Sequence, residues 1–206
     1  MRDASEADAR LLDAAVVAGG LGARYTQSHR KYHTLLHVED VLLRIEELQP
    51  PTEHELALAL AAWFHDAVYQ PDRDDNEERS AYAAYDALEQ AGASPELIAE
   101  VVRLIRLTAT HEADPDDVAG AVLCDADLSI LGAAPEKYQE YARNIRQEYA
   151  HLPVDQFNAG RARVLRSFLE REHIYHTPLA RKLWEDQARE NLAAEIAALD
   201  PPPDAA

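Results

Sequence analysis

The sequence predicts an all-α protein. Its long apolar runs are rich in alanine and leucine, and the alternation of apolar and polar residues that marks strands is missing almost throughout. Only 7 of the 206 residues are glycine. Helix starts are indicated by a capping side chain before proline at Ser94-Pro95, Asp114-Pro115 and Thr177-Pro178, and by the capping box Thr52-Glu53-His54-Glu55.

Taken in order, these signals divide the chain into helices with short loops between them. The first two are expected over 6–18 and 34–48, and the third, over 53–68, follows the capping box and is apolar until it reaches His65-Asp66. An acidic loop at 70–76 precedes the next helix. The remaining helices are predicted over 77–91, 95–110, 116–131, 135–150, 154–172 and 178–199, with loops at Gly92, Gly132 and Pro153 and a disordered tail at 200–206.

Length and composition favour one domain spanning residues 1–206. The chain is long enough for one sizeable core, and no Ser/Gly-rich linker, compositional break or solenoid repeat divides it. Lys and Arg total 20 against 38 Asp and Glu, a formal net charge of −18. That charge argues against extended nucleic acid or an anionic membrane as a partner, because both require a cationic surface.

Cysteine usage and the lack of a long apolar segment predict a cytoplasmic protein. The single Cys124 excludes an internal disulfide and fits a reducing compartment, although it could pair between two chains. No apolar region follows a basic start, and no apolar run approaches the roughly 18 residues that span a bilayer. A homodimer is left open.

Three groups of polar residues are candidates for a metal site, and two of them directly follow apolar runs that predict burial. His33 and His37 are spaced i,i+4, which places them on one face if the helix already runs there. His65-Asp66 ends the apolar run 56–64, and Asp125 and Asp127 follow the apolar run 118–124. Burying unpaired polar groups costs several kcal/mol, so these residues need hydrogen bonds or a metal ion.

The order His37, His65-Asp66 and a distant aspartate in Ala126-Asp127-Leu128-Ser129 resembles the H…HD…D signature of the HD-domain superfamily of metal-dependent phosphohydrolases. The strings around His33 and Asp127 are also similar to stretches of the cyclic nucleotide phosphodiesterases, which share that fold. Small bacterial proteins described as predicted HD phosphohydrolases resemble the chain from about residue 25 to 195. The resemblance implies a single-domain HD-type helical bundle.

The same resemblance implies roles for individual residues. His37, His65, Asp66 and Asp127 would be metal ligands, with Asp66 and His33 in the catalytic machinery and His33 in the place of the phosphodiesterases' general acid. Asp125 could instead orient a ligand. The chain has no equivalent of the phosphodiesterases' long purine-clamping segment, so cyclic nucleotide specificity is not transferred.

Imidazole and carboxylate ligands without thiolate suit one or two ions of Mn, Fe, Co, Ni, Zn or Mg. Such an ion polarises a phosphoryl oxygen and lowers the pKa of bound water to near ~7. A protonated His33 could then donate to the leaving oxygen. The expected reaction is hydrolysis of a small phosphate ester, and a nucleotide is suggested by superfamily analogy.

Further residues are weaker candidates. His111 could help to hold a second metal, and Glu77 or Glu78 could contact a metal-bound water. Phosphate contacts could come from Arg30 and Lys31, or from Arg103, Arg106, Arg161 and Arg163.

Two other functions remain open from the sequence. The first is a non-catalytic metal-binding regulatory or scaffold protein with the same fold. The second is a ferritin-like di-iron protein, which would use Glu148-x-x-His151 and Glu170-x-x-His173. Both of these strings lie at predicted helix ends, which disfavours a site inside a bundle.

Overall fold

The computed structural model describes residues 6–48 and 52–199, and within these ranges it contains helices and no strand. The all-α prediction is confirmed. The chain forms two compact units, Met1–Asp127 and Leu128–Ala206. The expectation of one domain stays a prediction, and the expected tail at 200–206 lies outside the described residues.

Most predicted helices are found within a few residues of their expected bounds. The structure has α1 Glu6–Ala18, α2 Leu21–Arg24, α3 Leu35–Leu48, α4 Thr52–Phe64, α5 Asn76–Ala91, α6 Pro95–Leu107, α7 Val118–Asp127, the 3-10 helix η1 Leu128–Gly132, α8 Pro135–Glu148, α9 Val154–Leu169 and α10 Pro178–Leu199. The short helix α2 was not predicted. Helices α4, α6, α7 and α9 end three or four residues earlier than the apolar pattern indicated, and after α7 the chain continues as η1.

Side-chain caps explain several helix starts. Ser94 accepts a hydrogen bond from the Leu97 amide at 3.2 Å, and Thr177 accepts one from the Ala180 amide at 3.2 Å, as predicted. The predicted start after Asp114-Pro115 is wrong. Asp117 is the capping residue of α7, because its carboxylate accepts from the Gly120 amide at 2.9 Å.

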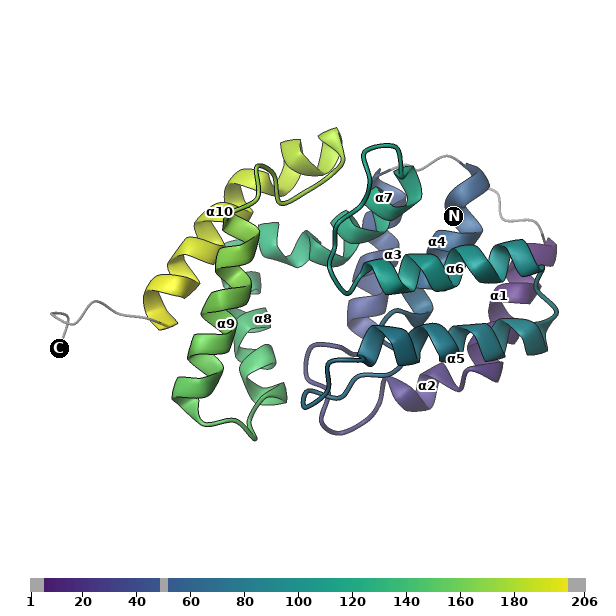
Figure 1. Ribbon diagram of the computed structural model, residues 1–206, viewed down its shortest axis with the longest axis horizontal. Coiled ribbons are helices and arrows are strands. Elements are labelled where there is room, and N and C mark those ends of the chain that lie inside the picture. Colours follow the sequence, from purple (N-terminus) through teal and green to yellow (C-terminus); the bar gives the residue numbers. More distant parts are fainter. Residues whose placement is uncertain (1–5, 49–51, 200–206) are drawn as a thin grey trace, which may run out of the picture. The chain divides into compact units, whose positions relative to one another are not determined.

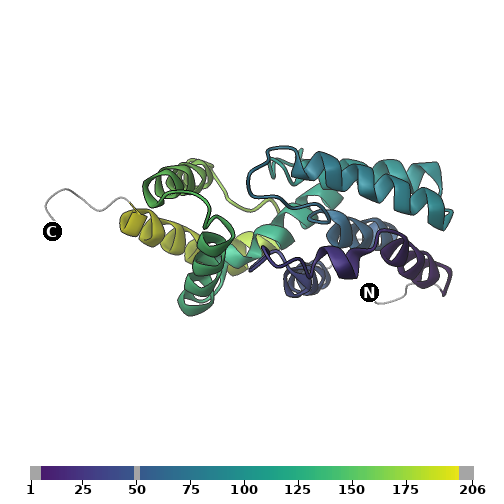
Figure 2. The same ribbon diagram turned by 90° about the horizontal axis from the view of Figure 1, so that it is seen from below.

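Helix α4 is the centre of the first unit. Its residues 57–62 are buried, as expected for a helix that is apolar on all sides, and α1, α3, α5, α6 and α7 all pack against it. Figure 2 shows α4 between the α5–α6 pair and α3. The polar residues that directly follow α4 are therefore delivered into the interior of this unit.

Helices α5 and α6 lie side by side as an antiparallel pair (Figure 1). The turn between them contains Gly92 at φ 79°, a left-handed conformation that glycine adopts without steric cost. Helix α5 also anchors the segment that follows α4. Ser80 exchanges hydrogen bonds with the backbone of Val68 at 2.9 and 3.2 Å, and Asn76 does the same with Gln70 at 3.0 and 2.9 Å.

The second unit contains η1, α8, α9 and α10, with α10 packed against η1 and α9. Asn191 of α10 donates to the carbonyls of Leu131 and Ala133, both at 2.8 Å. Arg161 of α9 forms an ion pair with Glu195 of α10 at 2.9 Å. These polar contacts join α10 to the η1 segment and to α9 at defined positions along the helices.

Candidate metal centre

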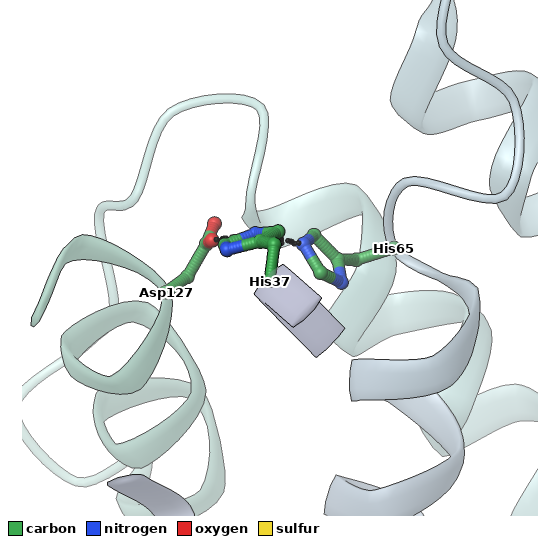
Figure 3. Close-up of side chains that lie close together, drawn as sticks. All are labelled: His37, His65 and Asp127. Carbon is green, nitrogen blue, oxygen red and sulfur yellow. Dashed lines mark hydrogen bonds and ion pairs between the residues drawn. The ribbon is translucent and has the colours of Figure 1, made fainter. Parts of the chain in front are cut away.

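Three ligand atoms meet inside the first unit. The Nε2 atom of His37 lies 3.1 Å from Nε2 of His65 and 3.1 Å from Oδ1 of Asp127, and His65 Nε2 lies 3.5 Å from the same oxygen. One potential ligand atom from each of these residues lies within 4.8 Å of the other two. Figure 3 shows the two imidazoles and the carboxylate turned toward one another. This buried group could hold a metal ion.

Each of the three residues comes from a different helix or helix end. His37 lies in the first turn of α3, His65 directly follows α4, and Asp127 is the last residue of α7. These helices pack against one another, so residues far apart in the sequence converge at one point. A single helix turn could not present three ligands in this way.

Hydrogen bonding orients the His65 ring. Its Nδ1 atom lies 2.9 Å from the Ala62 carbonyl oxygen, which can only accept a hydrogen bond. The proton of the neutral ring is therefore held on Nδ1, which leaves Nε2 with a lone pair directed at His37 and Asp127. This is the tautomer that binds a metal through Nε2.

Asp66 is the fourth predicted ligand, and the structure brings it to the same place. Its Oδ2 atom lies 3.2 Å from His65 Nε2 and 3.6 Å from His37 Nε2. Asp125, which the sequence left as an alternative near Asp127, is fully buried in α7.

His111 reaches the centre through Asp127. Its Nε2 atom lies 2.8 Å from Oδ2 of Asp127, the oxygen that is not turned toward His37 and His65. His111 has a positive φ of 53°, and it is the only residue other than glycine with a positive φ in the described ranges. His111 follows α6, and the residue with this unusual backbone conformation is the one whose imidazole contacts the Asp127 carboxylate.

His33 lies beside the centre, but it is not on the helix with His37. Residues 31–34 form a bend and α3 begins at Leu35, so the helix does not yet run at His33 and the condition for a shared helical face is not met. The His33 ring is held by its neighbours instead. Its centroid lies 4.1 Å from the Tyr69 ring, 5.1 Å from the Tyr32 ring and 5.7 Å from the His37 ring.

The charges of the centre stabilise one another. Burial disfavours a charged His65, but the carboxylates of Asp66 and Asp127 outweigh burial and raise the pKa of His65 well above its usual range. Burial also disfavours ionised carboxyls, yet His65 and neighbouring imidazoles hold the pKa values of Asp66 and Asp127 below their usual range. Without a metal, the centre therefore favours a protonated imidazole between two carboxylates.

The predicted phosphate contacts have other partners. Arg30 is 4% exposed and donates to three backbone carbonyls, a geometry that favours a structural role over a phosphate contact. Lys31 is exposed and donates to the Ser28 carbonyl at 2.9 Å. Arg103 and Arg106 form ion pairs with carboxylates of Asp117 and Glu78, and Arg161 and Arg163 belong to the second unit.

Neither predicted water-contacting glutamate joins the centre in the described part of the chain. Glu78 is bound by Arg106 at 2.7 Å, on an exposed part of α5. Glu77 lies beside it in the first turn of α5, and no side-chain hydrogen bond or ion pair links it to His37, His65 or Asp127 among the described residues.

The di-iron alternative is not supported. Glu148 is buried, but His151, Glu170 and His173 are all exposed, so the two Glu-x-x-His strings do not form a buried ligand set. Both strings lie at helix ends, as the sequence predicted, and both belong to the second unit.

The sequence did not predict two residues that contact His33 and the segment after α4. Tyr69 and Arg30 were not predicted to contact the candidate ligands or their segments, because no local pattern connects positions so far apart. The sequence suggested Arg30 only as a possible phosphate contact.

Within the described ranges, no single helix has the length and hydropathy of a membrane span. One bent pair, Val118–Gly132 with Pro135–Glu148, passes the same test by length and composition only.

Comparison of the chain with protein-family models, with curated proteins and with solved structures finds no match. The interpretation of the centre therefore depends on its own residues and their geometry.

Proposed function

We propose that this protein is a metal-dependent phosphohydrolase of the HD type, which cleaves a small phosphate ester. The observation that supports this proposal is the convergence of His37, His65 and Asp127 from three separate helices, within 4.8 Å of one another. Their order along the chain, with Asp66 directly after His65, is the order of the HD signature described above.

The donor set fits a divalent ion. Two imidazole nitrogens and carboxylate oxygens, with no thiolate among them, suit Mn, Fe, Co, Ni, Zn or Mg, with one or two ions bound. A bound ion would polarise a phosphoryl oxygen and supply a nucleophilic hydroxide from water near neutral pH.

The side chains of this protein have separate tasks in the proposed reaction. His37, His65, Asp66 and Asp127 hold the ion, and the Ala62 carbonyl fixes the metal-binding tautomer of His65. His111 orients Asp127 through their 2.8 Å contact, or binds a second ion. His33, with its ring against Tyr69, is the proposed proton donor to the leaving oxygen of the ester.

The acidity of the protein favours a small substrate. With a net charge of −18, the chain attracts an anion only where a local positive charge overcomes the overall field. A divalent ion supplies that charge at one point. A nucleotide is the first substrate class to test. We propose a cytoplasmic location, which fits a single, buried cysteine.

Metal analysis of the purified protein tests the metal site. We expect a stoichiometric divalent ion in the unmutated protein, or after reconstitution, and its loss in the His65→Ala variant. The exposed His173 in the second unit offers a matched control, so His173→Ala should keep the ion. A wild-type protein that binds no ion under any condition would overturn the proposal.

Hydrolase activity is tested on a panel of nucleotides and phosphomonoesters with Mn, Co, Ni, Fe and Mg. We expect phosphate release that His65→Ala abolishes. The His33→Ala variant should keep its metal and lose turnover if His33 is the proton donor. Uniform inactivity with metal bound would instead favour the non-catalytic metal-binding protein.

A further inference from the structure

Arg30 is a buried cation that contacts the backbone of the segments carrying His33 and Asp66. Its side chain is enclosed by two aromatic rings, with the guanidinium carbon 5.0 Å from the centre of the Tyr25 ring and 5.5 Å from that of Tyr69. The residue is 4% exposed. A charge so deeply buried is stable only when its donors are satisfied by the protein.

Those donors are directed at two separate segments of the chain. Nη1 donates to the carbonyl of His33 at 3.0 Å and to the carbonyl of Asp66 at 2.9 Å, and Nη2 donates to the carbonyl of Ala67 at 3.3 Å. One nitrogen atom therefore joins the backbone of the proposed proton donor to the backbone of a proposed ligand.

The residues that Arg30 joins lie outside the helices, since α3 begins at Leu35 and the His65 amide, which donates to the Ala61 carbonyl at 2.8 Å, makes a helical hydrogen bond one residue before Asp66. Residues 31–34 form the bend before α3, and residues 65–68 form the turn and bend after α4. Regular helix hydrogen bonds therefore do not fix the distance between His33 and Asp66, whereas the two Nη1 hydrogen bonds do. The Nε atom of Arg30 is itself oriented by Gln27 at 3.2 Å.

We infer that Arg30 is a positioning residue of the metal centre, which fixes the His33 segment against the His65–Asp66 turn. This inference deepens the proposed function and rests on it. Lysine cannot replace Arg30, because an ammonium group lacks the planar fork that reaches three carbonyls on two segments. The inference also gives Arg30 a task that does not involve the substrate.

Cobalt binding measures the effect on the centre itself, because the visible absorption of protein-bound Co²⁺ responds to the number and geometry of its ligands. We expect Arg30→Lys to change the Co²⁺ spectrum and to weaken Co²⁺ binding by about tenfold or more, the usual effect of removing a group that orients metal ligands. Proton NMR of the imidazole rings in the metal-free protein provides a second readout, in which the ring signals of His33 should shift.

Arg189 provides a matched control in the second unit. Its guanidinium also donates to three backbone carbonyls, those of Leu169, Arg171 and Glu172, and it pairs with Glu185. Arg189→Lys therefore removes the same kind of contact away from the ligand residues. We expect it to leave the Co²⁺ spectrum, the Co²⁺ affinity and the His33 ring signals unchanged.

The outcomes separate the two proposals. If the wild type binds Co²⁺ and Arg30→Lys binds it with the same spectrum and affinity, the inference about Arg30 is overturned and the proposed function stands. If the wild type binds no Co²⁺, the proposed function fails, and unshifted His33 ring signals in Arg30→Lys would overturn the inference as well. If Arg30→Lys does not fold, Gln27→Ala removes one support of the guanidinium at an exposed position and should shift the same signals by less.

Discussion

Among single residues, His65 determines how metal binding responds to pH. Asp66 and Asp127 outweigh burial and raise the pKa of His65 well above its usual range, so the metal-free protein holds a proton on this ring at neutral pH. A metal ion needs the neutral imidazole and must displace that proton. We therefore expect the affinity for Co²⁺ to rise with pH through the neutral range, by at most about tenfold per pH unit if one proton is displaced.

Calorimetric titration with Co²⁺ in buffers of different ionisation enthalpy checks this expectation, because the apparent binding enthalpy then reports the number of protons released. We expect about one proton at pH 7. Binding that is independent of pH and releases no proton would show that His65 is neutral before the ion arrives.

His111 offers a test of backbone strain near the centre. A residue other than glycine at φ 53° raises the free energy of the folded state. Both His111→Ala and His111→Gly remove the imidazole that contacts Asp127. Only glycine also removes the strain. We expect the free energy of unfolding of the metal-free His111→Gly variant to exceed that of His111→Ala by about 1 kcal/mol, measured by urea denaturation.

The opposite order would contradict this account. At an ordinary helical or extended position, alanine is more stable than glycine, because glycine loses more conformational entropy on folding. Both variants should also bind Co²⁺ more weakly than the wild type, since Asp127 has lost the group that orients it.

At the scale of elements, the sequence predicts where helices form better than where they meet. Capping residues and apolar runs act locally, so Ser94, Thr177 and the run before His65 are informative without any tertiary structure. Four ligands could be proposed because each stands at the end or on the buried side of an apolar helix. Their order along the chain matches the signature of the family that the sequence resembles. His37, His65 and Asp127 do converge, and Asp66 lies 3.2 Å from His65, while the role of the four residues as ligands stays a prediction.

The elements that were predicted wrongly depend on distant partners. Helix α4 ends at Phe64, although the His65 amide still donates to the Ala61 carbonyl at 2.8 Å. The carbonyls of Asp66 and Ala67 then accept from Arg30 instead of from a following helical turn. His33 is kept off α3 in the same way, through its own carbonyl. The pattern of apolar and polar residues within 31–34 and 65–68 could not predict that Arg30 joins the two segments.

The contact between η1 and α10 yields a second stability prediction. A Cβ atom on Gly132 would lie 2.5 Å from the Trp184 Cβ and 2.7 Å from its carbonyl oxygen, and backbone atoms cannot rotate away. We expect Gly132→Ala to lower the free energy of unfolding by about 1–3 kcal/mol, because α10 must move away from η1. Urea denaturation followed by circular dichroism measures the change.

Gly160 provides the control for this substitution. It lies within α9, and a Cβ atom there would meet no atom within 4 Å. Gly160→Ala should therefore raise the free energy of unfolding by about 0.5–1 kcal/mol, through the better helix propensity of alanine. Equal effects of the two substitutions would mean that the close approach of Gly132 to Trp184 does not stabilise the protein.

For the whole molecule, the net charge of −18 makes the ionic strength a test of how the substrate is held. In the proposed function, an anionic phosphate ester would approach against a repulsive field, and an ion bound by His37, His65 and the carboxylates would attract it at short range. Added salt screens the long-range repulsion, since the Debye length falls from about 30 Å at 0.01 M to about 10 Å at 0.1 M, while it affects the short contact at the ion much less. The KM for a dianionic or more highly charged substrate should therefore fall as NaCl rises across this range, with kcat nearly constant.

Steady-state kinetics with substrates of increasing negative charge measure this, and the fall in KM should grow with that charge. A KM that rises with salt would mean that a cationic surface attracts the substrate, a conclusion that would move the search for phosphate contacts back to Lys31 and the arginines.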